Sequence, residues 1–280
     1  MDALVSLDNY FNLLLSLPHL SFMTVMASFF LAMARLIPIM VLAPFLGART
    51  VPATIRMMFS VAIIAILLPA VLFSLKKDIP FDFMFIAYFI KELLIGFVLG
   101  MLITIPFFIA QSAGSLTDYM RGAQSLQVTD PSTTTQTSPI GILYNYVLIT
   151  IFFFIGGPFI FIDALAKSFQ LIPVDKFLNP MFLSMKIPFW HLIIGLLNYV
   201  LSMAIQLAAP SLIGVLMAEM FLGIANRLAP QVQIVFLGIS LKSWVGLALL
   251  ALAWYYIMQQ LSKEASNWLK VVENSIKLAV

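Results

Sequence analysis

Polar and charged side chains interrupt an otherwise apolar stretch in the last third of the chain. They are Glu219, Asn226, Arg227, Gln231 and Lys242. A carboxylate at membrane depth is costly unless it is paired or hydrated, so these residues indicate either proton or ion chemistry or an assembly contact. A helical hairpin that turns near Pro230 would bring Lys242 opposite Glu219. We therefore predict that Glu219 pairs with Lys242, or with a basic residue of a neighbouring subunit.

A second set of charges lies in the first half of the chain. Arg35 is the single charge in the apolar stretch 22–46, and Lys91 and Glu92 open another apolar stretch. Because adjacent residues of a helix point about 100° apart, we expect Lys91 and Glu92 to have different partners. All three are candidates for buried charges that specify how helices assemble.

Glycines accompany both glutamates at helical spacing. Glu92, Gly96 and Gly100 fall on one helical face, and Gly223 falls on the face of Glu219. Small residues four positions apart allow membrane helices to approach closely. Beside a membrane-level carboxylate, this spacing favours a contact between subunits over a surface that faces lipid.

A polar run that begins at Ala113 opens a long loop rich in Ser, Thr and Gln. The candidate residues of this loop and of the apolar flank before it are Pro106, Phe107, Phe108, Gly114, Asp118, Arg121, Gly122, Asp130 and Pro131. Glycine and Asp-Pro sequences indicate turns. Asp118 and Arg121 are candidate partners that would hold the base of the loop. Two interpretations stay open, a solvated connector and a flexible segment that faces an aqueous lumen.

Several classes of function are excluded by what the sequence lacks. It has no cysteine, which removes disulfides, thiolate nucleophiles and Cys–metal sites. Its two histidines lie far apart, so we expect no zinc or haem site and no cofactor. The net charge of +3 is spread along the chain, unlike the clustered Lys and Arg of a nucleic-acid surface. No metalloprotease, hydrolase or phosphate-binding motif occurs, which argues against an enzyme.

The elements that must position these residues are membrane helices. The chain is 62% hydrophobic and 10% charged, far from the composition of a soluble domain. Uncharged stretches long enough to cross roughly 30 Å of hydrocarbon occupy 57–75, 93–117, 140–162, 192–218 and 243–262. The stretch 22–46 is a sixth if Arg35 is tolerated. We predict an all-α integral membrane protein.

These segments pair into three helical hairpins. The predicted pairs are 22–46 with 55–75, 83–116 with 140–162, and 188–222 with 232–260. Proline inside nearly every span predicts kinks, because proline removes a backbone hydrogen bond. In lipid the freed carbonyl must be satisfied by a neighbouring helix or by water, so the kinks indicate helices that pack mainly on protein.

The last twenty residues, 261–280, have the pattern of a separate amphipathic helix. Leu261, Ala265 and Trp268 follow helical spacing, while lysines recur every seven residues. Such a helix lies on an anionic membrane surface, docks on a partner or is simply solvated. The pattern does not choose among these three.

The order and spacing of the marked residues resemble a known family over nearly the whole chain. The resemblance rests on Arg35, Lys91, Glu92, Asp118, Arg121, Gly122, Asp130, Pro131, Gly156, Gly157, Pro210, Gly214, Glu219, Asn226, Arg227, Pro230, Gln231 and Lys242. The family is the export-gate protein called SctT, YscT or SpaR in injectisomes and FliR in flagella. The run from Asp118 to Gly122 and the Gly156–Gly157 pair favour the injectisome branch.

The resemblance implies a subunit of a type III secretion export gate in the bacterial inner membrane. It implies an SctR-like part at 1–185, with a pore-closing loop near 111–138, and an SctS-like hairpin at 186–260. The implied partners are SctR-like and SctS-like subunits in a helical ring, an SctU-like switch protein, inner rod or needle subunits, and secreted proteins in transit. In this family the helices are bent and largely raised out of the membrane plane.

Two other classes of membrane protein are alternatives to an export-gate subunit. A self-contained, ion-coupled secondary transporter would use Glu92 and Glu219 as coupling sites, and is expected to show an inverted repeat that is not visible here. An intramembrane enzyme lacks a catalytic constellation. We therefore predict a non-enzymatic gate subunit that contributes wall and closure to a channel for unfolded proteins.

Overall fold

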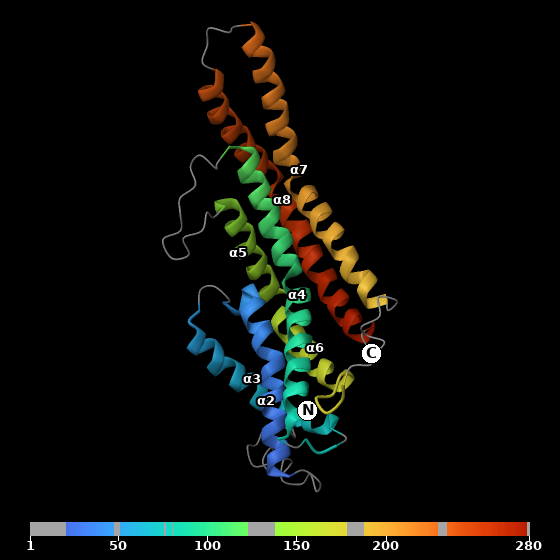
Figure 1. Ribbon diagram of the computed structural model, residues 1–280. Helices are drawn as coiled ribbons and strands as arrows, with labels where there is room; N and C mark the ends of the chain where they lie inside the picture. Colours follow the sequence, from blue (N-terminus) through green and yellow to red (C-terminus); the bar gives the residue numbers. More distant parts are fainter. Residues whose placement is uncertain are drawn as a thin grey trace. The chain divides into compact units, whose positions relative to one another are not determined.

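The part of the chain that the structure describes is built from helices. The structure is a computed structural model and describes residues 21–47, 51–75, 77–79, 81–122, 138–177, 188–228 and 234–278. Its elements are α2 (Phe22–Leu42), the 3-10 helix η1 (Pro44–Leu46), α3 (Ala53–Ser74), α4 (Phe83–Met120), α5 (Pro139–Phe154), α6 (Gly157–Leu171), α7 (Pro188–Leu228) and α8 (Ile234–Leu278), as Figure 1 shows. The predicted all-α class is confirmed.

Five of the described helices are long and apolar enough to cross a membrane. They are α2, α3, α4, the part of α7 from Gly195 to Leu228 and the part of α8 from Gly238 to Trp268. The bent pair of α5 and α6 makes a sixth if it is one span. The chain is therefore a multi-pass membrane protein, as the apolar stretches predict.

The predicted span 140–162 is not one helix. It is divided at Gly156, which adopts a left-handed φ of 74° after α5 ends. A residue without a Cβ takes this conformation at no steric cost, and Pro158 fits the first turn of the next helix, where its missing N–H is not needed. The remaining interior prolines lie inside continuous helices: Pro38 in α2, Pro69 in α3, Pro106 in α4 and Pro210 in α7.

The contacts within the chain divide it into two compact units. The first unit contains α2, α3, the part of α4 up to Thr104 and α6 from Pro158 onward. Its core is apolar, with Leu31, Ile64 and Phe169 wholly buried. The predicted first hairpin is confirmed, since α2 packs on α3.

The second unit contains α4 from Ile105, α5, and most of α7 and α8. The second predicted hairpin is present as α4 against α5, where the rings of Phe107 and Phe152 lie 5.7 Å apart. The third is present as α7 beside α8 (Figure 1). Tyr144 of α5 meets Trp254 of α8, with ring centroids 6.2 Å apart, so α5 also contacts the third hairpin.

The prediction of a separate tail helix at 261–280 is wrong. Helix α8 continues without a break to Leu278, because no glycine or proline follows Gly246 to end it. The described part of the apolar stripe of this segment, up to Trp268, packs inside the chain. Leu261, Ala265 and Trp268 are buried, and the Trp268 ring stacks on Tyr199 of α7 with centroids 5.8 Å apart.

Candidate functional site

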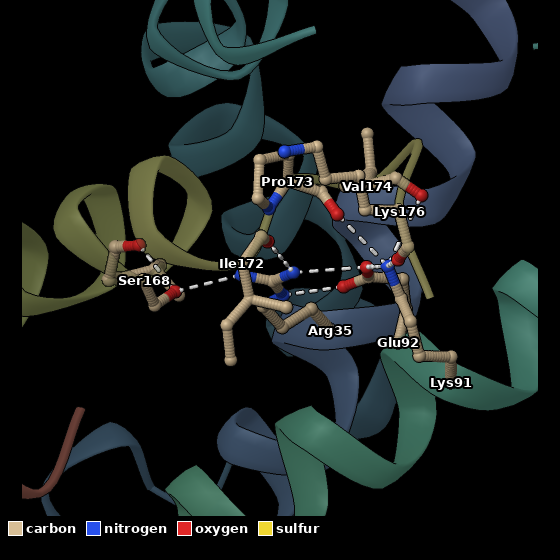
Figure 2. A network of polar contacts seen from close by, with 9 residues as sticks. Arg35, Lys91, Glu92, Ser168, Ile172, Pro173, Val174 and Lys176 are labelled. Atoms are coloured by element: carbon tan, nitrogen blue, oxygen red, sulfur yellow. Dashed lines mark hydrogen bonds and ion pairs between the residues drawn. The ribbon is translucent and has the colours of Figure 1, made fainter. Parts of the chain in front are cut away.

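The most deeply buried charges join Arg35 of α2 to Glu92 of α4 (Figure 2). Arg35 Nε donates to Glu92 Oε2 at 2.5 Å, and Nη2 donates to Oε1 at 3.0 Å. Both side chains are 0% exposed. A pair bonded through two N–H groups fixes the orientation of its partners as well as their separation. The pair therefore locks α2 to α4.

Arg35 also binds the C-terminal end of α6. Its Nη1 donates to Ser168 Oγ at 3.1 Å, and Nη2 donates to the carbonyl of Ile172 at 2.7 Å. The guanidinium group lies over the Phe169 ring, 4.2 Å from the centroid. Carbonyl groups at the end of a helix lack an intrahelical partner and favour a cation nearby. One side chain thus ties three helices together.

Lys91 completes this network from the neighbouring position on α4. Its Nζ donates to the backbone carbonyls of Pro173, Val174 and Lys176, at 3.1, 3.2 and 2.7 Å, and so fixes the turn that follows α6. The expectation that Lys91 and Glu92 have different partners is only half right. Lys91 Nζ also lies 2.7 Å from Glu92 Oε1, because the long lysine side chain bends back toward its neighbour.

Gly96 and Gly100 permit this network by letting α4 approach α2. A Cβ at Gly96 would overlap the backbone carbonyl of Arg35, and one at Gly100 would lie 3.1 Å from the Cα of Ile39. The predicted close approach is therefore present. The predicted type of contact is wrong, since the approach is between two helices of the same chain and not between subunits.

The arrangement leaves little capacity for chemistry. Both oxygens of Glu92 accept hydrogen bonds from Arg35, and Lys91 is directed at carbonyl oxygens and at Glu92. The cluster of Arg35, Lys91 and Glu92 holds two cations and one anion. The remaining positive charge is balanced by backbone carbonyl oxygens and by the face of the Phe169 ring. A buried network whose members are all satisfied rigidifies and specifies a packing arrangement. This network is suited to fix architecture rather than to exchange protons or ions.

A second cluster lies in the second unit, at the junction of α4 and α5. Asp118 accepts from Arg121 Nε at 2.7 Å, from the backbone N–H of Ile140 at 2.8 Å, and from the Ser138 hydroxyl. The backbone of Gly114 approaches that of Gly141 so closely that a Cβ at Gly114 would lie 2.5 Å from the Gly141 Cα. Asp118 and Arg121 are therefore partners, as predicted, and Asp118 also binds the start of α5.

Arg121 extends this cluster to α8. Its Nη1 lies 3.4 Å from Ser243 Oγ. The chain then leaves α4 through Gly122, whose left-handed φ of 81° suits the end of a helix. Arg121 thus connects the base of the loop to the third hairpin.

The third charged pair is the one that the hairpin geometry predicts. Lys242 Nζ of α8 lies 2.5 Å from Glu219 Oε1 of α7, and the two side chains are 27% and 40% exposed. Asn226 and Arg227 lie further along α7 and are exposed. Gly223 is also exposed, and a Cβ there would meet nothing within 4 Å. The close packing predicted at Gly223 is therefore not made by the described residues of this chain.

The apolar flank before the loop presents a single aromatic side chain. Pro106 and Phe107 are buried, whereas Phe108 is 48% exposed. Three further candidates, Asp130, Pro131 and Gln231, lie outside the residues that the structure describes.

Sequence reasoning missed a polar cluster at the other end of the third hairpin. The Tyr199 hydroxyl of α7 donates to Glu264 Oε2 of α8, and Gln260 Nε2 donates to Glu264 Oε1 at 3.1 Å. Glu264 is 8% exposed. The sequence could have predicted this cluster from the position of Glu264 between Leu261 and Ala265. A carboxylate beside an apolar stripe needs hydrogen-bond donors when that stripe is buried.

Comparison with known proteins identifies a family to which most of this chain is similar. A family model described as bacterial export proteins, family 1, matches residues 26–268. The Yop proteins translocation protein T of Yersinia pestis is 35% identical over 191 residues, which cover 68% of this chain and 70% of that protein. The surface presentation of antigens protein SpaR of Salmonella typhimurium is 29% identical over 231 residues, 82% and 83% of the two chains. The flagellar biosynthetic protein FliR of Bacillus subtilis is 27% identical over 251 residues, 90% and 95% of the two chains.

The matched range runs from α2 into α8 and contains the Arg35, Asp118, Glu219 and Glu264 clusters. The chain therefore belongs to the bacterial export proteins, family 1.

Proposed function

We propose that this chain is a subunit of a type III secretion export apparatus. In this proposal it forms part of the wall and closure of the channel through which unfolded proteins cross the bacterial inner membrane, without catalysis of its own. The observation that carries the proposal is the family match over residues 26–268 of a chain with five or six apolar helices. The higher identity to the Yersinia translocation protein than to the Bacillus flagellar protein supports the injectisome branch.

The proposed partners are SctR-like and SctS-like subunits, an SctU-like switch protein, inner rod or needle subunits, and secreted proteins in transit. An exposed apolar stripe on α4 supports a helical neighbour for the first unit. Its members recur every three or four residues and are Ile86, Ile90, Leu94, Phe97 and Met101. A stripe at this spacing matches the surface that one helix offers to another.

We propose that the exposed Phe108 ring makes the apolar contact that closes the channel. The Asp118 cluster would hold the base of the loop that follows α4. Phe107 is held against Phe152, so of the two adjacent phenylalanines only Phe108 has an exposed ring to offer a lumen. Asp118 joins the end of α4 to the start of α5 and keeps the two ends of the connecting loop together.

The self-contained transporter is less well supported by the same geometry. Glu92 is saturated by Arg35 and Lys91, and Glu219 is paired with Lys242, so each carboxylate already has a counter-charge within this chain. A transporter would take up substrate as the purified chain in liposomes. A gate subunit would instead co-purify with two small hydrophobic membrane proteins.

The closure role is tested by ion leakage through the assembled complex. We would replace residues 124–136 with a short Gly-Ser linker, which keeps Asp118 and Ser138, and would combine this change with Phe108→Ala. The expected result is normal recovery of the complex and increased ion conductance across the membrane. The matched control is Phe154→Ala, which removes another exposed phenylalanine, 86% exposed, from the same unit. An intact seal in the combined variant would remove the closure role.

A further inference from the structure

The last residues of α4 follow one face of α8, and both segments belong to the second unit. A Cβ at Gly122 would lie 3.9 Å from Ile239 Cγ2. The Arg121 side chain extends to Ser243, whose Oγ lies 3.4 Å from Nη1, and passes over Gly246. Ile239, Ser243 and Gly246 are four and three residues apart, so they share one helical face over about two turns. A displacement of α8 therefore reaches Arg121 directly.

Gly246 leaves the space that the Arg121 side chain occupies. A Cβ at Gly246 would lie 3.5 Å from Arg121 Cβ and 3.2 Å from Cγ2 of Val215 on α7. Small residues let neighbouring helices approach closely, and at this position α8 meets both α4 and α7. A longer side chain at position 246 would therefore have to move Arg121, the α7 helix, or both.

Asp118 depends on Arg121 for its counter-charge. Arg121 Nε and Nη2 lie 2.7 and 2.6 Å from Asp118 Oδ1. The other oxygen, Oδ2, accepts from the Ile140 N–H and the Ser138 hydroxyl. The Asp118 side chain is 7% exposed, and among the described residues Arg121 is the one cation paired with it. A buried carboxylate that loses its cation is strongly destabilised. Displacement of Arg121 therefore weakens the bonds that hold the start of α5.

No neighbouring residue on this face of α8 can replace Gly246. The face continues to Leu250 one turn beyond Gly246 and back to Ser243 one turn before it. If α8 moved by one turn, about 5.4 Å, in one direction, the Leu250 side chain would occupy the space of Arg121. In the other direction, Ser243 would fill that space and Ile239 would face the guanidinium group. Arg121 therefore fits one register of α8.

We propose that the register of α8 controls the junction of α4 and α5, and that Arg121 passes the register on to Asp118. In the register that the structure shows, Gly246 leaves room for Arg121 beside Asp118. This register is held by the Glu219–Lys242 pair, whose side chains are 40% and 27% exposed and therefore accessible to a charged group of a neighbouring subunit. When α8 slips, Arg121 leaves Asp118 and the start of α5 is released. The coupling rests on these contacts alone, whereas its effect on channel closure rests on the proposed function.

Hydrogen exchange at the start of α5 tests the coupling. The N–H groups of Ile140 and Gly141 report on the junction, because they donate to Asp118 Oδ2 and to the N-cap hydroxyl of α5. We would measure their exchange in the full-length chain, with any subunits that co-purify, in detergent micelles. Gly246→Leu should speed it about tenfold, because the added side chain displaces Arg121 and leaves Asp118 buried without its cation.

Gly238→Leu is the matched control on the same helix. A Cβ at Gly238 would lie 3.2 Å from Leu222 of α7, the distance at which one at Gly246 meets Val215, and no atom of Arg121 lies within 4 Å of it. Both variants therefore crowd α7, and only Gly246→Leu crowds Arg121. Exchange in the control should equal that of the unchanged chain. Equal rates in the two variants would overturn the coupling.

A second variant tests the register itself. Lys242→Ala breaks the pair that fixes α8 on α7 and leaves Arg121 unchanged. It should speed exchange at Ile140 and Gly141 about threefold, as expected for the loss of a partly exposed ion pair. Lys263→Ala, which removes an exposed lysine elsewhere on α8, should have no effect. Unchanged exchange in Lys242→Ala would show that the register does not control the junction.

The route through Arg121 is tested by a double-mutant cycle, which also serves if Gly246→Leu fails to fold. Ser243→Ala removes only the hydroxyl contact and should speed exchange about twofold, since a bond of 3.4 Å is weak. In the Arg121→Gln background the same change should add nothing, and equal increases in both backgrounds would overturn the coupling. Ion conductance measured in parallel separates the two proposals. Faster exchange without increased conductance keeps the coupling and counts against the closure role, whereas unchanged exchange removes the coupling whatever the conductance.

Discussion

Arg35 shows how a charged residue can be wholly buried among membrane helices when its donors meet acceptors on two other helices. Its N–H groups donate to four acceptors, which are the two oxygens of Glu92, the Ser168 hydroxyl and the Ile172 carbonyl. A guanidinium group has five such donors and cannot lose its charge in proteins. The stability of the first unit therefore depends on Glu92 remaining an anion that accepts through both oxygens.

The change Glu92→Gln tests this dependence. It should lower the free energy of unfolding by about 3–5 kcal/mol, because it leaves Arg35 and Lys91 buried without a counter-charge. The measurement is denaturant-driven unfolding of the purified chain in detergent micelles. Asp163→Asn is the matched control, since it breaks an ion pair with Lys167 whose side chains are 60% and 41% exposed. Such a pair contributes less than about 0.5 kcal/mol. Equal losses in the two variants would contradict the buried network.

Helix packing in this chain depends on which glycines meet another helix. Gly96 and Gly223 both follow a glutamate by four residues, and the sequence predicts the same role for both. In the structure Gly96 lies against the α2 backbone, whereas no described residue lies within 4 Å of a Cβ built at Gly223. Periodicity identifies the helical face of a residue, but it does not identify which face a second helix covers.

Alanine substitution separates these roles. Gly96→Ala should prevent the close approach of α2 and α4 and sharply reduce the yield of folded chain, because the Arg35 backbone carbonyl occupies the space of the added Cβ. Gly195→Ala, on α7 and likewise without a described residue within 4 Å of its Cβ, should be neutral or stabilising by up to about 1 kcal/mol, as expected for removing glycine from a helix. Gly223→Ala should match Gly195→Ala in the isolated chain. If it instead lowers recovery of the assembled complex alone, a neighbouring subunit packs on Gly223.

For the whole molecule, the sequence predicts the class and the pairing of helices better than the partners of individual side chains. Uncharged length and proline position are properties of one segment, so the hairpins and the spans other than 140–162 follow directly. The Arg35–Glu92 and Tyr199–Glu264 contacts join residues 57 and 65 positions apart, and segment periodicity carries no information on such pairs. The Glu219–Lys242 pair was predictable because few residues separate the two helices of this hairpin, which fixes which positions lie opposite each other.

The Glu219–Lys242 pair leads to a prediction about the whole assembly. Glu219→Ala or Lys242→Ala should reduce recovery of the assembled complex more than membrane insertion of the chain, since the pair fixes how α7 and α8 present their outer surfaces. The double variant Glu219→Lys with Lys242→Glu should restore recovery, because the reversed charges can form the same pair. The measurement is native gel electrophoresis of the solubilised complex alongside the amount of chain in the membrane fraction. If the double variant recovers no better than the single ones, Glu219 or Lys242 contacts a neighbouring subunit whose charge the reversal opposes, and the pair does not act within this chain alone.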